Sequence, residues 1–171
     1  VVFLMLTVTA QDVPVQIESI AVTSEQTCSS TFITHELDHI TTVPGGDEVR
    51  AFEANGGGVG INDLDNDGDL DIVLANHAGM NNILWNEGGL QFRKESMPIG
   101  DSRAVTIVDV DGDNWLDIVF SRRASAPNYF RNGGDGTFSL ESLPNVSKPL
   151  YSIAWADFDK DGDLDLVGGT Y

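Results

Sequence analysis

Three acidic loops of nine residues share one spacing rule and recur along the chain. They occupy residues 63–71, 109–117 and 157–165, and each reads D-x-D-x-D-(G/N)-x-x-D. Their first aspartates lie 46 and then 48 residues apart. A carboxylate at every other position, followed by a turn residue at the sixth, is typical of a loop that wraps around a hard cation. Recurrence at a fixed long period indicates that each loop belongs to a repeated structural unit.

The odd-numbered loop positions are expected to face a bound ion. Positions 1, 3 and 5 present carboxylates, position 7 offers its main-chain carbonyl, and position 9 adds a carboxylate with two oxygens. About six or seven oxygen ligands suit Ca²⁺ better than Mg²⁺, and loops without Cys or His are poor sites for zinc or copper. The sequence therefore predicts about three calcium sites. The predicted metal residues are Asp63, Asp65, Asp67, Asp69, Asp71, Asp109, Asp111, Asp113, Trp115, Asp117, Asp157, Asp159, Asp161, Asp163 and Asp165.

The remaining loop positions are also patterned. The sixth position is expected to need a left-handed backbone, which explains Gly68 and Gly162, with Asn114 as the next most tolerant residue. Positions 2 and 8 are apolar in all three loops and are expected to anchor each loop to the core. A solvated acidic turn is the alternative for any one loop, but three copies with matched flanks argue against it. The anchors would be Leu64, Leu70, Val110, Leu116, Phe158 and Leu164.

The segments that flank the loops read as β-strands. Before each loop, large residues fall four and two positions ahead of the first Asp and alternate with smaller ones, which is a strand with two different faces. The small face suits close approach of neighbouring sheets. After each loop, residues 70–74, 116–120 and 164–168 are short and rich in β-branched residues. The large residues before the loops are Val59, Ile61, Val105, Ile107, Ile153 and Trp155.

Two further strands follow in each of the first two units, around Gly/Asn-rich hairpin connections at 86–89 and 132–136. Four antiparallel strands in about 47 residues, repeated, describe the blade of a β-propeller. The predicted fold class is therefore all-β, a propeller of four-stranded antiparallel blades present as an incomplete arc. Blades are predicted at 52–97 and 98–145, with a partial blade at 146–171. Because blades stack to bury their faces, the natural protein is expected to continue.

The composition limits which classes of partner molecule the chain is expected to bind. The formal net charge is −18, yet 14 of the 27 acidic residues lie inside the three loops, so much of the acidity is ordered by spacing. The 9 basic residues form no patch, which disfavours nucleic acid and anionic lipid as partners.

The N-terminal residues 1–10 resemble the end of a secretory signal, with small residues at the cleavage position, although an ordinary buried strand is the alternative. The segment is too short to span a bilayer, so no membrane insertion is expected. These features predict a secreted, periplasmic or cell-surface protein. Residues 11–51 contain a candidate strand that would close a last blade.

Residues 58–73 (GVGINDLDNDGDLDIV), their two counterparts and residues 132–138 resemble the FG-GAP/VCBS repeat family, which includes the propellers of integrin α-subunits and many bacterial secreted proteins. The resemblance covers about residues 52–171, and the Asn-x-Gly-rich turn is similar to the CRTAC/ASPIC-type members. It implies calcium sites that brace blades and an extracellular structural or interaction role, with an unidentified protein or glycan as ligand.

Two alternatives involve catalysis. His35-Glu36-Leu37-Asp38-His39 matches H-E-x-x-H, which on a helix would bind zinc as in a hydrolase. The β-branched residues around it and Pro44 disfavour a helix, and a third ligand is not evident. No catalytic set is recognisable outside the loops, so the chain is expected not to be an enzyme. The other alternative is an accessory propeller domain of a secreted enzyme whose catalytic part is absent here.

Overall fold

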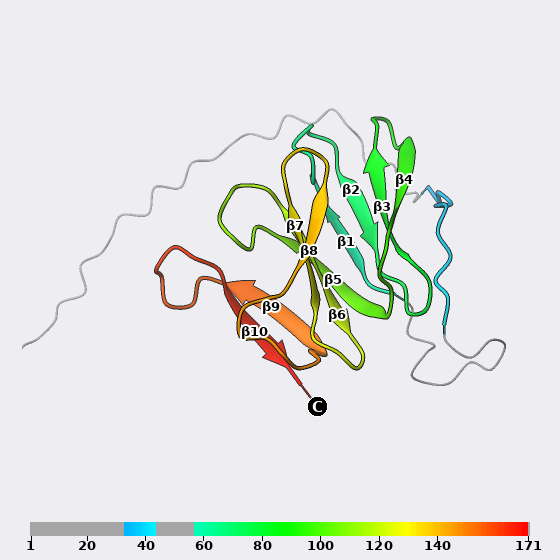
Figure 1. The fold of residues 1–171 in the computed structure, drawn as a ribbon. Coiled ribbons are helices and arrows are strands. Elements are labelled where there is room, and N and C mark those ends of the chain that lie inside the picture. The colour runs from blue at the N-terminus through cyan, green and yellow to red at the C-terminus, as the bar shows by residue number, and fades with distance from the viewer. Residues whose placement is uncertain (1–32, 44–56, 171) are drawn as a thin grey trace, which may run out of the picture. The chain divides into compact units, whose positions relative to one another are not determined.

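The computed structural model describes residues 33–43 and 57–170. All regular structure in that part of the chain is β, as the sequence predicts (Figure 1). The first sheet contains β1 (Val59–Asn62), β2 (Asp71–Leu74), β3 (Asn81–Asn86) and β4 (Phe92–Met97). The second contains β5 (Ser102–Val108), β6 (Asp117–Arg122), β7 (Asn128–Asn132) and β8 (Phe138–Glu141). β9 (Ser152–Ala156) and β10 (Asp165–Gly169) form a two-stranded hairpin.

The two four-stranded sheets have the same topology and register. Each is an antiparallel meander in which consecutive strands pair. Leu74 on β2 lies opposite Asn82 on β3, and Phe120 on β6 lies opposite Asn128 on β7. The described sheets do not close into a ring, so the fold is an incomplete arc of propeller blades. We call β1–β4 the first blade and β5–β8 the second blade.

The main hydrophobic core lies between the two blades. Ile83 from the first blade and Ile118 from the second are fully buried in one cluster. Phe120 and Phe130 meet edge to face within it, with their ring centroids 5.9 Å apart. Burial of such apolar faces against each other is the main favourable term in stacking the blades. The buried members are Leu64, Val73, Ala75, Ile83, Trp85, Met97, Ile118, Phe120 and Phe130.

The innermost strands of the two blades approach closely because one presents small residues. A Cβ added at Gly60 on β1 would lie 3.1 Å from Cδ1 of Ile107 on β5. The main-chain N–H of Gly58 donates to the carbonyl of Arg103 at 2.6 Å. The predicted pairing of a small face with a neighbouring sheet is therefore confirmed. The large face of β1 is exposed, with Val59 and Ile61 at 57% and 58% exposure.

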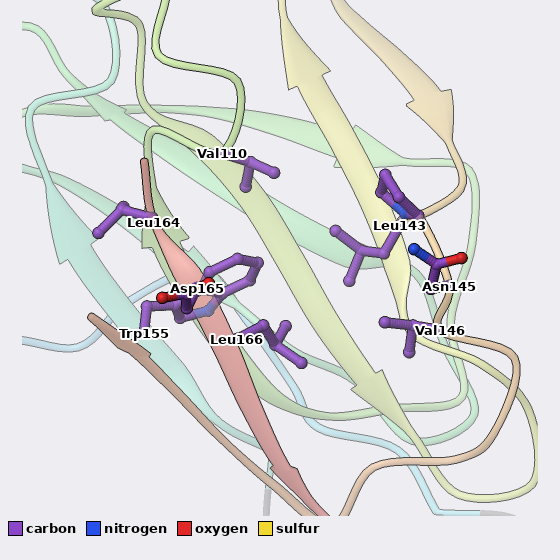
Figure 2. Close-up of a pocket in the computed structure, with 9 residues that line it drawn as sticks. Val110, Leu143, Asn145, Val146, Trp155, Leu164, Asp165 and Leu166 are labelled. Atoms are coloured by element: carbon purple, nitrogen blue, oxygen red, sulfur yellow. The ribbon is translucent and has the colours of Figure 1, made fainter. Parts of the chain in front are cut away.

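A second, smaller cluster joins the second blade to the hairpin. Val119, Tyr129 and Leu143 are buried there, and Trp155 and Leu166 of the hairpin pack against them. The packing is incomplete, because a cavity of about 480 Å³ remains between these elements. Figure 2 shows the side chains that line it. Its lining residues are Val110, Leu143, Pro144, Asn145, Val146, Trp155, Leu164, Asp165 and Leu166.

The N-terminal predictions fall mostly outside the described residues. The predicted signal remnant at 1–10 lies there, as does most of the segment 11–51. The described part of that segment, residues 33–43, contains no strand. Residues 37–43 instead contact the first blade, where Lys94 on β4 lies 3.3 Å from the carboxylate of Asp38.

Candidate metal centres

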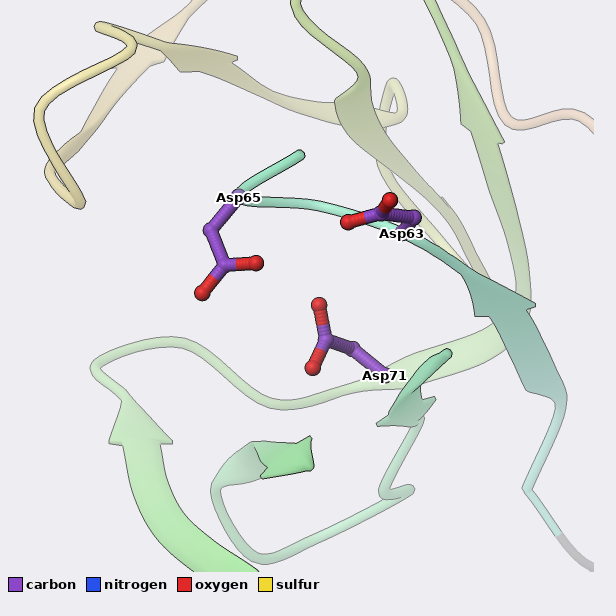
Figure 3. Close-up of side chains that lie close together, drawn as sticks. All are labelled: Asp63, Asp65 and Asp71. Carbon is purple, nitrogen blue, oxygen red and sulfur yellow. The ribbon is translucent and has the colours of Figure 1, made fainter. Parts of the chain in front are cut away.

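Three carboxylates converge in each acidic loop. In each group every residue offers one oxygen, and these oxygens lie within 4.8 Å of one another. Figure 3 shows the first group, with its carboxylates directed toward a common space. Oxygens bound to one Ca²⁺ at about 2.3–2.6 Å lie at most about 5 Å apart, so the donors fit a shared calcium ion in type and spacing. The groups are Asp63, Asp65 and Asp71; Asp109, Asp111 and Asp117; and Asp157, Asp159 and Asp165.

The first aspartate of each loop organises the turn. Asp63 accepts hydrogen bonds from the main-chain N–H groups of Asp67 and Gly68, at 3.2 and 3.0 Å. Asp109 accepts from Gly112, Asp113 and Asn114, at 2.8, 3.2 and 2.9 Å. Because these bonds fold the chain back over the first carboxylate, they hold the loop in a ring around the candidate ion position. Asp157 accepts in the same way from Lys160 and Gly162.

The predicted left-handed backbone at the sixth position is confirmed. Its φ angle is 95° at Gly68, 72° at Asn114 and 100° at Gly162. The structure adds that the fourth position is left-handed as well, including at the non-glycine residues Asn66 and Lys160, with φ of 60° and 64°. Two left-handed positions in each nine-residue loop explain why the loop needs Gly or Asn so often. Nothing in the sequence indicates a left-handed backbone at Lys160.

The ninth aspartate ties the loop to the rest of its blade. Asp71 is 1% exposed, and its two oxygens accept from the N–H groups of Leu64 and Asn86, both at 2.9 Å. Burial raises the pKa of the Asp71 carboxyl, while these N–H groups oppose the shift. A cation bound nearby would stabilise the charged form of this buried carboxyl.

Asp117 has the same position and role in the second blade. It is fully buried and accepts from the N–H groups of Val110 and Asn132, at 2.9 and 2.8 Å. It also accepts from the hydroxyl of Tyr129 at 3.1 Å. Burial, joined by the charge of Asp117, raises the pKa of Tyr129, so this phenol stays protonated and donates. Burial likewise raises the pKa of Asp117.

The third loop receives the least support from neighbouring strands in the described chain. Asp165 is half-buried at most, and among the described residues its hydrogen-bond partner is the N–H of Phe158, at 2.9 Å. Only two strands surround this loop in the described chain. The partner supplied by β3 and β7 to the first two loops has no described counterpart here, so this loop is held by its own hydrogen bonds.

The fifth and seventh positions lie outside the three groups. The fifth carboxylates of Asp67, Asp113 and Asp161 accept from the N–H of the seventh residue, at 2.8, 2.9 and 3.0 Å. These bonds close the second half of each loop. Ligation by the fifth carboxylates, and by the carbonyls of Asp69, Trp115 and Asp163, stays a prediction.

Two residues near the second loop escaped the sequence analysis. Arg131 on β7 contacts Asp111 and donates to Asp113 at 2.8 Å. The side-chain amide of Asn132 donates to the carbonyl of Leu64 in the first loop, at 2.9 Å, and to that of Leu116 in the second, at 3.0 Å, and so joins the two loops. Asn132 could have been found, because Asn86 occupies the same place before the first hairpin turn. Arg131 could not, because the first blade has Trp85 at that place.

The expected anchoring by positions 2 and 8 is correct only in part. Leu64 is 1% exposed in the main core, and Val110 and Leu116 pack against the buried clusters. Leu70 is 56% exposed, so the prediction is wrong for it, and its loop is anchored through Leu64 and Asp71. Phe158 and Leu164 of the third loop are also exposed.

The H-E-x-x-H segment does not form the helix that a zinc site of this type needs. Residues 33–43 contain no helix. Nδ1 of His39 lies 2.7 Å from the side-chain amide nitrogen of Asn82, and Nε2 lies 3.4 Å from the hydroxyl of Thr41. In the described part of the chain, the groups of residues that could hold a metal ion contain aspartates alone.

Comparison with known families agrees with this geometry. A model described as the FG-GAP-like repeat matches residues 63–120 and 109–168, and each match begins at the first aspartate of a loop. The chain belongs to the FG-GAP-like repeat family. No curated protein matches the chain. Each matched FG-GAP-like segment thus begins at one candidate metal loop and ends in the strand that follows the next loop. Among the described residues, no helix is long and apolar enough to cross a membrane.

Proposed function

We propose that this chain is a calcium-stabilised, extracellular β-propeller module with a structural or binding role and no catalytic activity of its own. The observation that carries the proposal is the convergence of three carboxylate groups at equivalent places in successive repeats. Their donors are all oxygens, which calcium prefers. Bound calcium would neutralise carboxylates that otherwise repel one another, and the residues to hold it are the first, third and ninth aspartates of each loop.

The positions of the loops support bracing rather than catalysis. Asp71 and Asp117 are buried and tied to the main chain of the next hairpin, so they link the loop to β3 and β7. An ion held by such residues stabilises the folded blade, because its binding free energy becomes part of the folding free energy. An extracellular location is consistent with this role, since calcium is plentiful there and scarce in the cytosol. We infer that the ligand is an extracellular protein or glycan.

A calcium titration tests the proposal. The melting temperature should rise with calcium concentration, because the ion binds the folded chain and not the unfolded one. Isothermal titration should give a stoichiometry of about three, as the three oxygen groups imply. Magnesium at the same concentration is the control and should raise the melting temperature less. A melt that EDTA leaves unchanged would show that the loops are not metal sites.

A further inference from the structure

The first blade carries a peptide segment on the end where β2 leads into β3. Asn76, just beyond β2, accepts from the N–H of Thr42 at 2.9 Å and donates to the carbonyl of Ile40 at 3.1 Å. The N–H of Ala78 donates to the carbonyl of Thr42 at 3.0 Å. Asn82 completes the site from β3 through its contact with His39. Asn76 therefore binds the main chain of residues 40–42, and Asn82 contacts the side chain of His39.

The second blade has an equivalent place on the connection from β6 to β7. Phe120 and Asn128 pair across the strands as Leu74 and Asn82 do, and both connections have the same length. By this register Asn128 corresponds to Asn82, and Arg122 corresponds to Asn76. The two equivalent places can therefore be compared. Residues 39–42 of the same chain cover the place on the first blade.

The equivalent place in the second blade has donors without partners. Asn128 is 7% exposed, and its side-chain amide nitrogen makes no hydrogen bond. Nε of Arg122 is buried and makes none either, while Nη2 lies 3.8 Å from Asp101. Buried donors without acceptors are rare, because each loses its hydrogen bonds to water without a replacement. In the first blade the matching amide has His39, so the absence of a partner is specific to the second blade.

A pocket opens at these donors. Its volume is about 340 Å³, and Asn128 and Arg122 both line it. Leu140, which is 52% exposed, supplies an apolar wall, and Glu141 supplies an acceptor. Donors and an acceptor side by side match a peptide main chain, which presents both C=O and N–H groups. The negative charge of the Glu141 carboxylate would repel a simple anion. The complete lining is Arg122, Ser125, Ala126, Pro127, Asn128, Leu140, Glu141 and Ser142.

We propose that this pocket binds an extended peptide segment of a partner protein, with a main-chain carbonyl group on Arg122 and an acceptor side chain on Asn128, as Asn76 and Asn82 hold Ile40 and His39. The segment His39–Thr42 on the first blade shows how such a peptide lies. One difference sets the specificity. A Cβ at Gly79 would lie 2.8 Å from the Thr42 hydroxyl, whereas Ser125 stands at the corresponding place in the second blade. The bound peptide must therefore have a small residue where the first blade accepts Thr42.

The test uses the full chain and a capped heptapeptide with the sequence of residues 37–43 carrying Thr42→Gly. We expect the peptide to shift the NMR signals of the Asn128 side-chain amide saturably, with a Kd of about 1 mM or tighter. Arg122→Gln and Leu140→Glu should each weaken binding at least about fivefold, and both change side chains that are partly exposed, so the fold is retained. Arg93→Gln, on the exposed face of β4, is the matched control and should leave the Kd unchanged.

Three results would overturn the proposal. The first is the absence of a shift at Asn128, or a shift that both pocket variants leave intact. The second is a shift confined to Asn82, which would mean that the peptide only displaces residues 37–43 from the first blade. The third is an equal effect of sodium acetate at the same concentration, which would make the pocket an anion site. None of these readouts depends on calcium, so the proposal is tested independently of the proposed function.

Discussion

Arg131 on β7 donates from Nη2 to the Asp113 carboxylate at 2.8 Å, and its guanidinium also contacts Asp111. Asp111 belongs to the second group of candidate calcium ligands. A fixed cation of the protein therefore already neutralises part of the second loop. The first blade has Trp85 at the corresponding place, and its indole donates to Glu95 rather than to a loop. We therefore expect the second site to differ from the first in its response to metal.

We expect Arg131→Gln to tighten calcium binding at the second loop. The ion would no longer compete with the guanidinium for Asp111, but exposed ion pairs are weak, so the gain should be modest, about threefold. The main-chain amide signal of Trp115, followed during a calcium titration, reports on this loop. Arg93→Gln, which removes an exposed Arg paired with Glu87, should leave the affinity unchanged. An unchanged affinity in Arg131→Gln would show that arginine and ion do not compete.

Asp117→Ala should destabilise the chain far more than Asp165→Ala, although both residues hold the ninth loop position. Removing the Asp117 carboxylate leaves three donors without an acceptor, those of Val110, Asn132 and Tyr129. We therefore expect a loss of about 3 kcal/mol in the free energy of unfolding. Urea unfolding in EDTA measures the part that does not depend on metal. Equal losses in the two variants would mean that burial of the ninth aspartate contributes nothing.

Gly60→Val should loosen the contact between the blades. The added side chain would meet Ile107, whose Cδ1 lies 3.1 Å from the position of the new Cβ, and overpacking of this kind costs about 1–3 kcal/mol. Ile107→Ala makes room, so the double variant should lose less than the sum of the two single losses. Thermal unfolding of the four proteins measures this coupling, and strict additivity would contradict the packing.

Acid should release residues 37–43 from the first blade. Burial, together with the nearby Lys94, lowers the pKa of His39, while Asp38 opposes the shift. Because the folded state disfavours protonation, this contact stabilises above the ordinary pKa of 6.5 and is lost as the pH falls below it. The Thr42 amide, bonded to Asn76, should therefore lose hydrogen-exchange protection between about pH 7.5 and about pH 5. His39→Ala should show low protection at both ends of this range, and wild-type protection that does not change would refute the switch.

The repeat was predictable because local rules fix it. Alternation before each loop and β-branched residues after it predict strands, and the structure confirms them for all three loops. The convergence of the first and third aspartates also follows from the loop's own spacing. The exposure of Leu70 did not follow, because an apolar residue in a loop is buried only where another element covers it.

The sequence by itself determined the repeat, the four-stranded blades and the oxygen chemistry of the acidic loops, since spacing within nine residues decides which side chains can share an ion. Only the tertiary structure decided how the three loops differ. Arg131 reaches the second loop from a strand 18 residues beyond Asp113, and Asn132 reaches Leu64 across 68 residues. Such partners depend on how strands and blades stack, and stacking brings together residues that no local pattern connects.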